Sequence, residues 1–202
     1  MMESPDRFTS ADEVAANAAR TIALQMLEER GRGAVLVGVA RVDAALEHLL
    51  QAVMSPATAK SDGLFLPERP LGSIGAKVAL ASRLGLIDNS VERALNVLRK
   101  LRNAFAHSAE SASLGDPAHS SRLAEVYADA RTNPLWPPLE TVLADQPPSA
   151  HGPLEPALRD YILLITILVA FLEATAQQLP PFQPSAVVRF SGATSATPPP
   201  AS

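Results

Sequence analysis

The chain has no cysteine, few aromatic residues and no hydrophobic run long enough to cross a membrane. Without cysteine it cannot form disulfides, use a thiol nucleophile or bind zinc through thiolates, and this composition fits a reducing cytosol. The most apolar run, Tyr161 to Leu172, is shorter than the ~20 residues that a bilayer-spanning helix needs. The N-terminus is polar and acidic, which predicts no secretory signal. We therefore expect a cytoplasmic protein that makes no membrane contact.

An excess of positive charge and a glycine-rich phosphate loop are also missing. The formal net charge of -4 argues against a protein that coats nucleic acid without sequence preference. Gly72 and Gly75 are not preceded by the strand that a nucleotide site needs. His48, next to Glu47, has no second histidine one turn away with which to hold a metal ion. The sequence therefore predicts no cofactor and no metal site.

What the chain does contain is helical periodicity. Its 202 residues are 47% hydrophobic, which is enough for one domain with a substantial core. Helices are expected from Ser10 to about Arg30, from about Ala34 to Met54, and as a pair within Leu71 to His107. The helix that begins near Ala34 is apolar on nearly all sides at its start, so we expect it to be the central helix of a bundle.

The second half of the chain is interrupted by proline. A helix within 117–130 is expected to turn Leu123, Val126 and Tyr127 inward. Residues 132–153 contain six prolines and predict a long connection that packs through Trp136 but has no regular structure. A last helix is expected from about Leu154 to Leu179.

These elements together predict an all-α protein, a bundle of five or six helices with a proline-rich connection. We expect a flexible N-terminus at residues 1–9, a single helical domain at 10–179 and a disordered tail at 180–202. The only strand signal is weak and falls at Ala186 to Phe190.

The pair within Leu71 to His107 carries the clearest functional signal. Gly85 fits a left-handed helix cap, and Asp88 or Asn89 can cap the helix that follows. At ~100° per residue, Arg102 is expected near the middle of that helix's apolar stripe. A buried arginine needs a partner because it cannot lose its charge, and Glu47 on the central helix is the candidate. The stripe consists of Val91, Ala94, Leu95, Leu98, Leu101 and Phe105.

Motifs within this pair resemble the mannitol operon repressor family of bacterial proteins. They are the Pro70-Leu71-Gly72 lead-in, Lys77, the turn Leu84 to Ile87, and Leu98 to Arg102 followed by His107. The resemblance covers roughly Val35 to His107 and the remainder only in outline. It implies a homodimeric transcriptional regulator that acts mainly through protein–protein contacts.

More broadly, Arg102-Asn103-x-x-x-His107 is similar to the R-x4-6-H motif of the HEPN superfamily, which implies a HEPN-like helical fold. This resemblance also implies an alternative function, a metal-independent ribonuclease of toxin type with an antitoxin partner. Two subunits would bring their motifs together: Arg102 would hold the scissile phosphate, His107 would move the proton in attack by the ribose 2′-hydroxyl, and Asn103 would orient one of them. Whether the protein is an enzyme stays open at this point.

Positions 102 and 107 are about 140° apart on an ideal helix, so one copy of the chain does not bring Arg102 and His107 onto the same face. The same helix is locally basic, yet Asn96 is almost its only side chain, besides the arginines, that is suited to base edges. With the acidic total, the sequence predicts no direct DNA binding, and RNA is expected as a ligand only under the ribonuclease alternative. Lys77 has no oxyanion site nearby and is expected on the surface.

Overall fold

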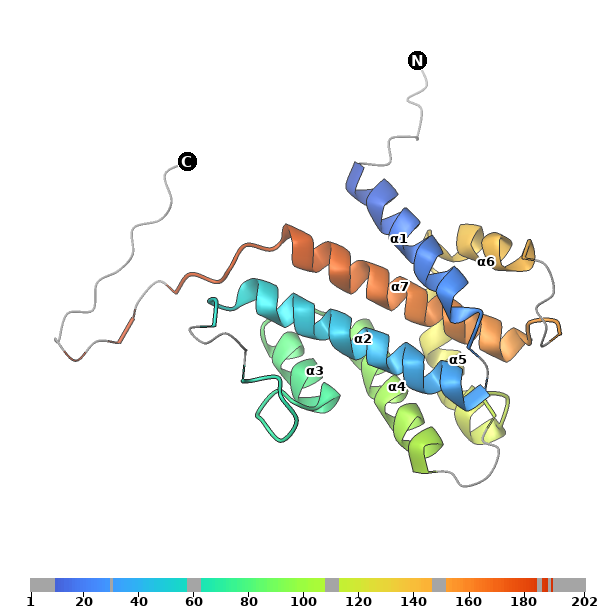
Figure 1. Ribbon diagram of the computed structural model, residues 1–202, viewed down its shortest axis with the longest axis horizontal. Helices are drawn as coiled ribbons and strands as arrows, with labels where there is room; N and C mark the ends of the chain where they lie inside the picture. Colours follow the sequence, from blue (N-terminus) through green and yellow to red (C-terminus); the bar gives the residue numbers. More distant parts are fainter. Residues whose placement is uncertain are drawn as a thin grey trace, which may run out of the picture.

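The structure is a computed structural model that describes residues 10–29, 31–57, 63–107, 113–146, 152–184, 187–188 and 190, with side chains from residue 16 onward. These residues form seven α-helices and no strand (Figure 1). The predicted all-α class is confirmed, but the predicted number of five or six helices was too low. The helices are α1 (Ser10–Met26), α2 (Gly31–Val53), α3 (Ile74–Arg83), α4 (Asn89–His107), α5 (Pro117–Ala130), α6 (Trp136–Ala144) and α7 (Pro156–Gln178). No helix in this part of the chain combines the length and apolarity needed to cross a membrane.

Two long helices, α2 and α7, form the centre of the bundle and lie side by side (Figure 1). They run in the same direction. Near their starts the Tyr161 hydroxyl donates to the Val35 carbonyl at 3.0 Å, and beyond their ends the Phe182 amide donates to the Val53 carbonyl at 2.7 Å. The predicted central position of α2 is confirmed, since its buried positions occur along its whole length.

The close approach of α2 and α7 depends on a glycine. A Cβ atom on Gly38 would lie 2.7 Å from the hydroxyl oxygen of Tyr161 and 3.1 Å from Ile165 Cγ1. Tyr161 and Ile165 are fully buried, so neither ring nor branched side chain has space into which it could move. The absence of a side chain at Gly38 therefore sets how closely the two central helices pack.

The turn between α3 and α4 has the predicted chemistry. Gly85 adopts a φ of +70°, the left-handed conformation that glycine tolerates best. The Asp88 carboxylate accepts a hydrogen bond from the Val91 amide at 2.8 Å and so caps α4. This hydrogen bond and one from the Ser90 hydroxyl lower the pKa of Asp88 below its ordinary value, so the cap stays ionised at neutral pH.

The proline-rich connection differs from the prediction, because α6 lies within it. Pro137 and Pro138 occupy the first turn of α6, where a backbone N–H has no helical partner and proline is tolerated. Trp136 is buried and its ring meets Tyr127 edge-on at 6.2 Å, so the predicted packing through Trp136 is confirmed. The prediction that 132–153 has no regular structure was wrong for residues 136–144.

The predictions for the N-terminal residues 1–9 and the C-terminal residues 180–202 can be compared with the structure only in part. The predicted flexible residues 1–9 lie outside the described residues. Of the predicted tail, residues 180–184, 187–188 and 190 are described, and they form neither helix nor strand. The weak strand signal at Ala186 to Phe190 is therefore not realised in the described part of that stretch.

Lys77 is buried rather than on the surface, with 3% of its side chain exposed. Its ammonium donates to Glu47 Oε2 at 2.7 Å and forms an ion pair with Asp43 Oδ1 at 3.0 Å. Burial alone would lower the pKa of Lys77, but attraction to Glu47 and Asp43 outweighs it and the pKa is raised above 10.5. The contact ties α3 to α2. It also occupies Glu47, which we expected to pair with Arg102.

We predict that Lys77→Met lowers the free energy of unfolding by about 2–3 kcal/mol, because it leaves two carboxylates without their cation. Removing one partner of a fully buried ion pair costs roughly 3–5 kcal/mol, and we expect a smaller loss here because solvent reaches both carboxylates. Urea denaturation followed by circular dichroism measures it. Lys100→Met, the same change at an exposed position of α4, is the control and is expected to alter stability by less than ~0.5 kcal/mol.

The pH dependence follows from the raised pKa of Lys77. A group that binds its proton more tightly in the folded state stabilises that state fully below its unfolded pKa of 10.5, and this contribution disappears as pH rises through the higher folded value. The stability difference between wild type and Lys77→Met is therefore expected to stay constant from neutral pH to near pH 10 and to shrink above it. A difference that shrank on acidification above pH 6 would contradict this assignment.

Candidate functional site

Arg102 is exposed, so the prediction that it lies inside the apolar stripe of α4 was wrong. On an ideal helix Arg102 lies only ~20° from Leu95, which is fully buried two turns earlier, so its angle on the helix does not account for its exposure. Arg102 belongs to the last two turns of α4, where its long side chain carries the guanidinium into water. A buried carboxylate partner is therefore not required, and Glu47 does not serve as one.

The other two motif residues, Asn103 and His107, are also exposed. Arg102 Nη1 lies 3.4 Å from the side-chain oxygen of Asn103, a long hydrogen bond between neighbours. No hydrogen bond or ion pair within the described residues joins His107 to Arg102. The structure thus brings Arg102 and Asn103 together and leaves His107 separate, on the last turn of α4.

The end of α4 is held by the start of α2. Arg32 Nη2 donates to the Ala106 carbonyl at 2.9 Å. A cation at this place is favourable because the last carbonyls of a helix carry partial negative charge and lack helical partners. The contact fixes the turn that carries His107.

The solvent side of α4 is basic and rich in amides along its whole length. Five residues at alternating spacings of three and four fall on one stripe, and we call this stripe the α4 outer face. Arg99 and Arg102 flank it, and a shallow depression of about 410 Å³ lies on its first half. The α4 outer face consists of Arg93, Asn96, Lys100, Asn103 and His107, of which all but the partly buried Asn96 are exposed.

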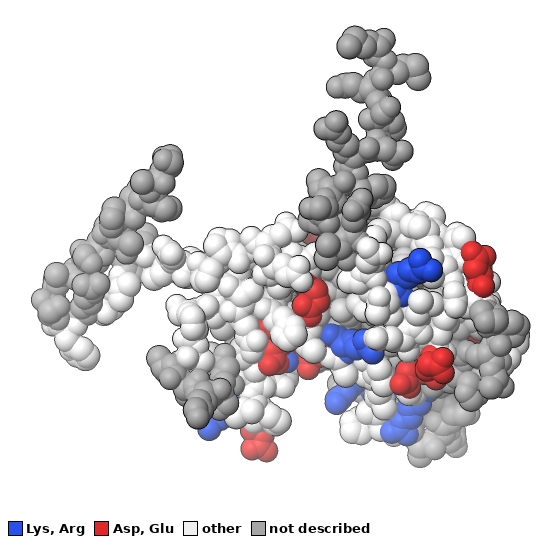
Figure 2. All heavy atoms as spheres, turned by 45° about the horizontal axis from the view of Figure 1, so that its top comes forward, with Lys and Arg blue, Asp and Glu red and all other residues white. Residues whose placement is uncertain are grey.

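Few carboxylates neutralise this face. Arg93 pairs with Asp129 at 3.4 Å, but both side chains are about half exposed, and such pairs contribute at most ~1 kcal/mol. Glu92 accepts a hydrogen bond from the Ser82 hydroxyl at 2.7 Å, beside the stripe rather than on it. On the face drawn in Figure 2, by contrast, basic and acidic side chains are interspersed among neutral ones.

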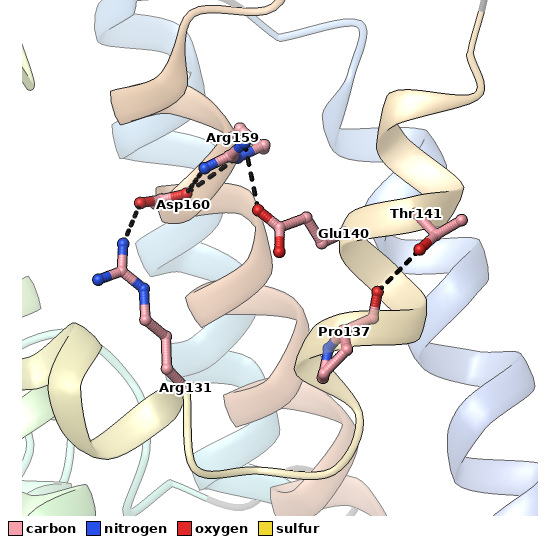
Figure 3. Close-up of polar contacts among 6 residues, drawn as sticks. All are labelled: Arg131, Pro137, Glu140, Thr141, Arg159 and Asp160. Carbon is pink, nitrogen blue, oxygen red and sulfur yellow. Dashed lines mark hydrogen bonds and ion pairs between the residues drawn. The ribbon is translucent and has the colours of Figure 1, made fainter.

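The most connected polar cluster lies elsewhere, and sequence reasoning missed it (Figure 3). Asp160 on α7 accepts from Arg131 at 2.7 Å through one carboxylate oxygen and from Arg159 at 2.8 Å through the other. Arg159 also reaches Glu140 on α6 at 3.2 Å. Both oxygens of Asp160 are used by these arginines, so the cluster joins α6, α7 and the residue that follows α5.

Arg131 is held further by aromatic rings. Its guanidinium carbon lies 5.8 Å from the Tyr127 ring centroid and 5.6 Å from that of Trp136, within the range of a cation–π contact. Burial raises the pKa of the Tyr127 hydroxyl well above its ordinary value, so this group stays neutral. The only sequence signal for the cluster was the charged pair Arg159-Asp160 next to an apolar run.

No protein-family model, curated protein or solved structure matches this chain. Among the residues that the structure describes, no group of three or more histidine, aspartate or glutamate side chains is placed to hold a metal ion. The α4 outer face with Arg102 is therefore the candidate site on the strength of its exposure and charge, and its geometry suits the binding of a macromolecular surface.

Because Arg102 and His107 are exposed, we predict that Arg102→Ala and His107→Ala each change the free energy of unfolding by less than ~0.5 kcal/mol. Thermal and urea denaturation of the purified variants measure this, with Lys77→Met as the destabilised reference. A loss above about 2 kcal/mol for Arg102→Ala would mean that the arginine has a structural partner after all.

Proposed function

We propose that this protein is a regulator of the mannitol operon repressor type, with a HEPN-like bundle, that acts as a homodimer in the cytoplasm through contacts with another protein. The observation that carries the proposal is the α4 outer face, a cationic stripe exposed to solvent that ends in Asn103 and His107 beside Arg102. Exposed residues of this kind are not needed by the core and are available to a partner.

A binding role needs less of this geometry than catalysis does. General acid–base chemistry requires the catalytic groups to converge on one reacting atom, in a place that excludes water. Arg102 and His107 point ~140° apart on an ideal helix and both lie in solvent. A charged helix face, however, recognises a complementary acidic surface without any cleft, and its charges also speed up association. The expected partner surface is therefore acidic.

The second candidate is a metal-independent ribonuclease of toxin type. It is favoured by one observation: Arg102, Asn103 and His107 are all accessible near the same end of α4, where a second copy could bring its own motif. Arg102 would bind the scissile phosphate and His107 would transfer the proton of the attacking 2′-hydroxyl, with Asn103 as an orienting group. An antitoxin would then be the protein partner.

A photo-cross-linking amino acid at Asn103 tests the regulator proposal in cells that carry the gene. We expect a discrete adduct with one protein, which is lost when Arg102→Glu reverses the charge beside it. The matched control is the same amino acid at Ala124, an exposed position of α5 away from the stripe. Equal adducts at both positions, or adducts with RNA alone, would count against a protein partner on the α4 outer face.

The ribonuclease alternative makes a separate prediction. A purified nuclease of this kind should cleave single-stranded RNA in the presence of a metal chelator and slow bacterial growth on expression. His107→Ala should abolish both effects while the protein stays folded. A regulator is expected to leave RNA intact and growth unchanged, with wild type and His107→Ala indistinguishable. Cleavage that disappears in the variant would replace the regulator proposal with the enzyme.

A further inference from the structure

An open apolar groove lies between α4, α5 and α7, on the other side of α4 from its outer face. Its volume is about 570 Å³, within the range of sites that bind ligands or peptide side chains. Leu86, Ile87 and Val91 lie half-buried along it, and Phe171 stands at its edge with 44% of its surface exposed. Residues 160–170 and Leu172 of α7 are buried, and Phe171 between them is exposed. This exposed aromatic ring indicates that the apolar groove is not covered by another part of the structure.

The chain also carries an exposed apolar segment after α7. Residues 187–190, Val-Val-Arg-Phe, which we call the C-terminal motif, follow α7 by a short connection. Val188 and Phe190 are fully exposed in the structure, and Val187 is 43% exposed. Water disfavours such side chains, and three within four residues predict a contact that buries them.

The connection is long enough for the motif to reach the groove of its own chain. The Phe182 amide is fixed to the Val53 carbonyl, one helical turn beyond Leu49, which lines the groove. The groove extends along α7 from Leu164 to Thr175, about 17 Å at 1.5 Å per residue. Phe182 and Phe190 are eight positions apart in the chain, a stretch that spans up to ~26 Å when extended.

Charge complementarity supports the same occupant. Two carboxylates, Asp88 and Asp129, line the groove, and hydrogen bonds keep the pKa of Asp88 below its ordinary value. The C-terminal motif contributes one charge, the cation of Arg189, between Val188 and Phe190. An apolar segment with a central arginine therefore matches an apolar groove with acidic groups among its lining residues.

We infer that the C-terminal motif docks into the α4–α5–α7 groove of its own chain and covers Phe171. A short tether favours this intramolecular site, because it holds the motif at a high effective concentration next to its own groove. The docked motif is in equilibrium with the arrangement of the structure, in which Val188 and Phe190 lie in solvent. The groove is then open to other molecules only when the tail is released.

Because the chain has no cysteine, the inference can be tested with two spin labels in the full-length protein. The labels are attached at Thr132→Cys, which lines the groove, and at Ser191→Cys, next to the motif. Pulsed electron paramagnetic resonance is expected to show a short-distance population. Phe190→Ser or Phe171→Ser should remove most of that population, and Arg189→Glu should reduce it. Leu84→Ser, which removes an equally exposed apolar side chain at the end of α3, should leave it unchanged.

Excess unlabelled protein separates the two possible origins of a short distance. If the motif docks within its own chain, mixing the doubly labelled protein with excess unlabelled protein leaves the short-distance population unchanged, which is the expected result. If that population disappears in the mixture, the motif docks into the groove of a second copy, and the inference is overturned. A single broad, long distance that is identical in wild type and Phe190→Ser would overturn it as well. The substituted side chains at positions 84, 132, 171 and 190 are exposed, so circular dichroism should show the same helicity for these variants.

Discussion

One buried ion pair joins α3, the helix that precedes α4, to the central helix α2. It is the contact of Lys77 with Glu47 and Asp43. This contact adds to the apolar packing of Phe65, Val78 and Ala81, which are buried in the core. The Phe65 ring, 5.9 Å from the same ammonium, covers it from the preceding loop. A tight turn links α3 to α4, and α4 also packs directly on α2 through its own buried stripe. The apolar core and the ion pair beneath α3 therefore hold α4 in place together, and the α4 outer face is presented on this support.

Much of the fold could be predicted from the sequence because its signals are local. Helical periodicity located the helices, and the Gly85 turn with its Asp88 cap needs only neighbouring residues. The prediction failed where distant elements decide the outcome. The sequence around Lys77 predicts a surface position, and only the two carboxylates of α2 explain its burial. Helix α6 was missed because its prolines are tolerated in the first turn and because Trp136 packs on Tyr127 from another helix.

The sequence predicted which residues form the candidate site, but it did not predict that Arg102 is exposed. The motif residues Arg102, Asn103 and His107 do lie at the end of α4. Spacing alone could not show that Arg102, almost in line with the buried Leu95, becomes exposed two turns later. Part of the signal that suggested a family has a structural explanation: a Cβ on Gly72 would overlap the Leu66 carbonyl oxygen, and Lys77 is a core ion-pair partner. These two residues bear on how the chain folds, whereas Arg102 and His107 are exposed and have no such structural role in the described residues.

The parallel pairing of α2 and α7 has a consequence for synthesis of the protein. The contact between Val35 and Tyr161 joins residues 126 positions apart, an unusually nonlocal arrangement for an all-helical protein. While the ribosome is still making the middle of the chain, α2 has emerged but its main packing partner has not. Its apolar side chains then face solvent or provisional neighbours, a situation that attracts chaperones and favours aggregation. α7, the last helix among the described residues, completes the core, so termination before α7 should yield a fragment that cannot close its own interior.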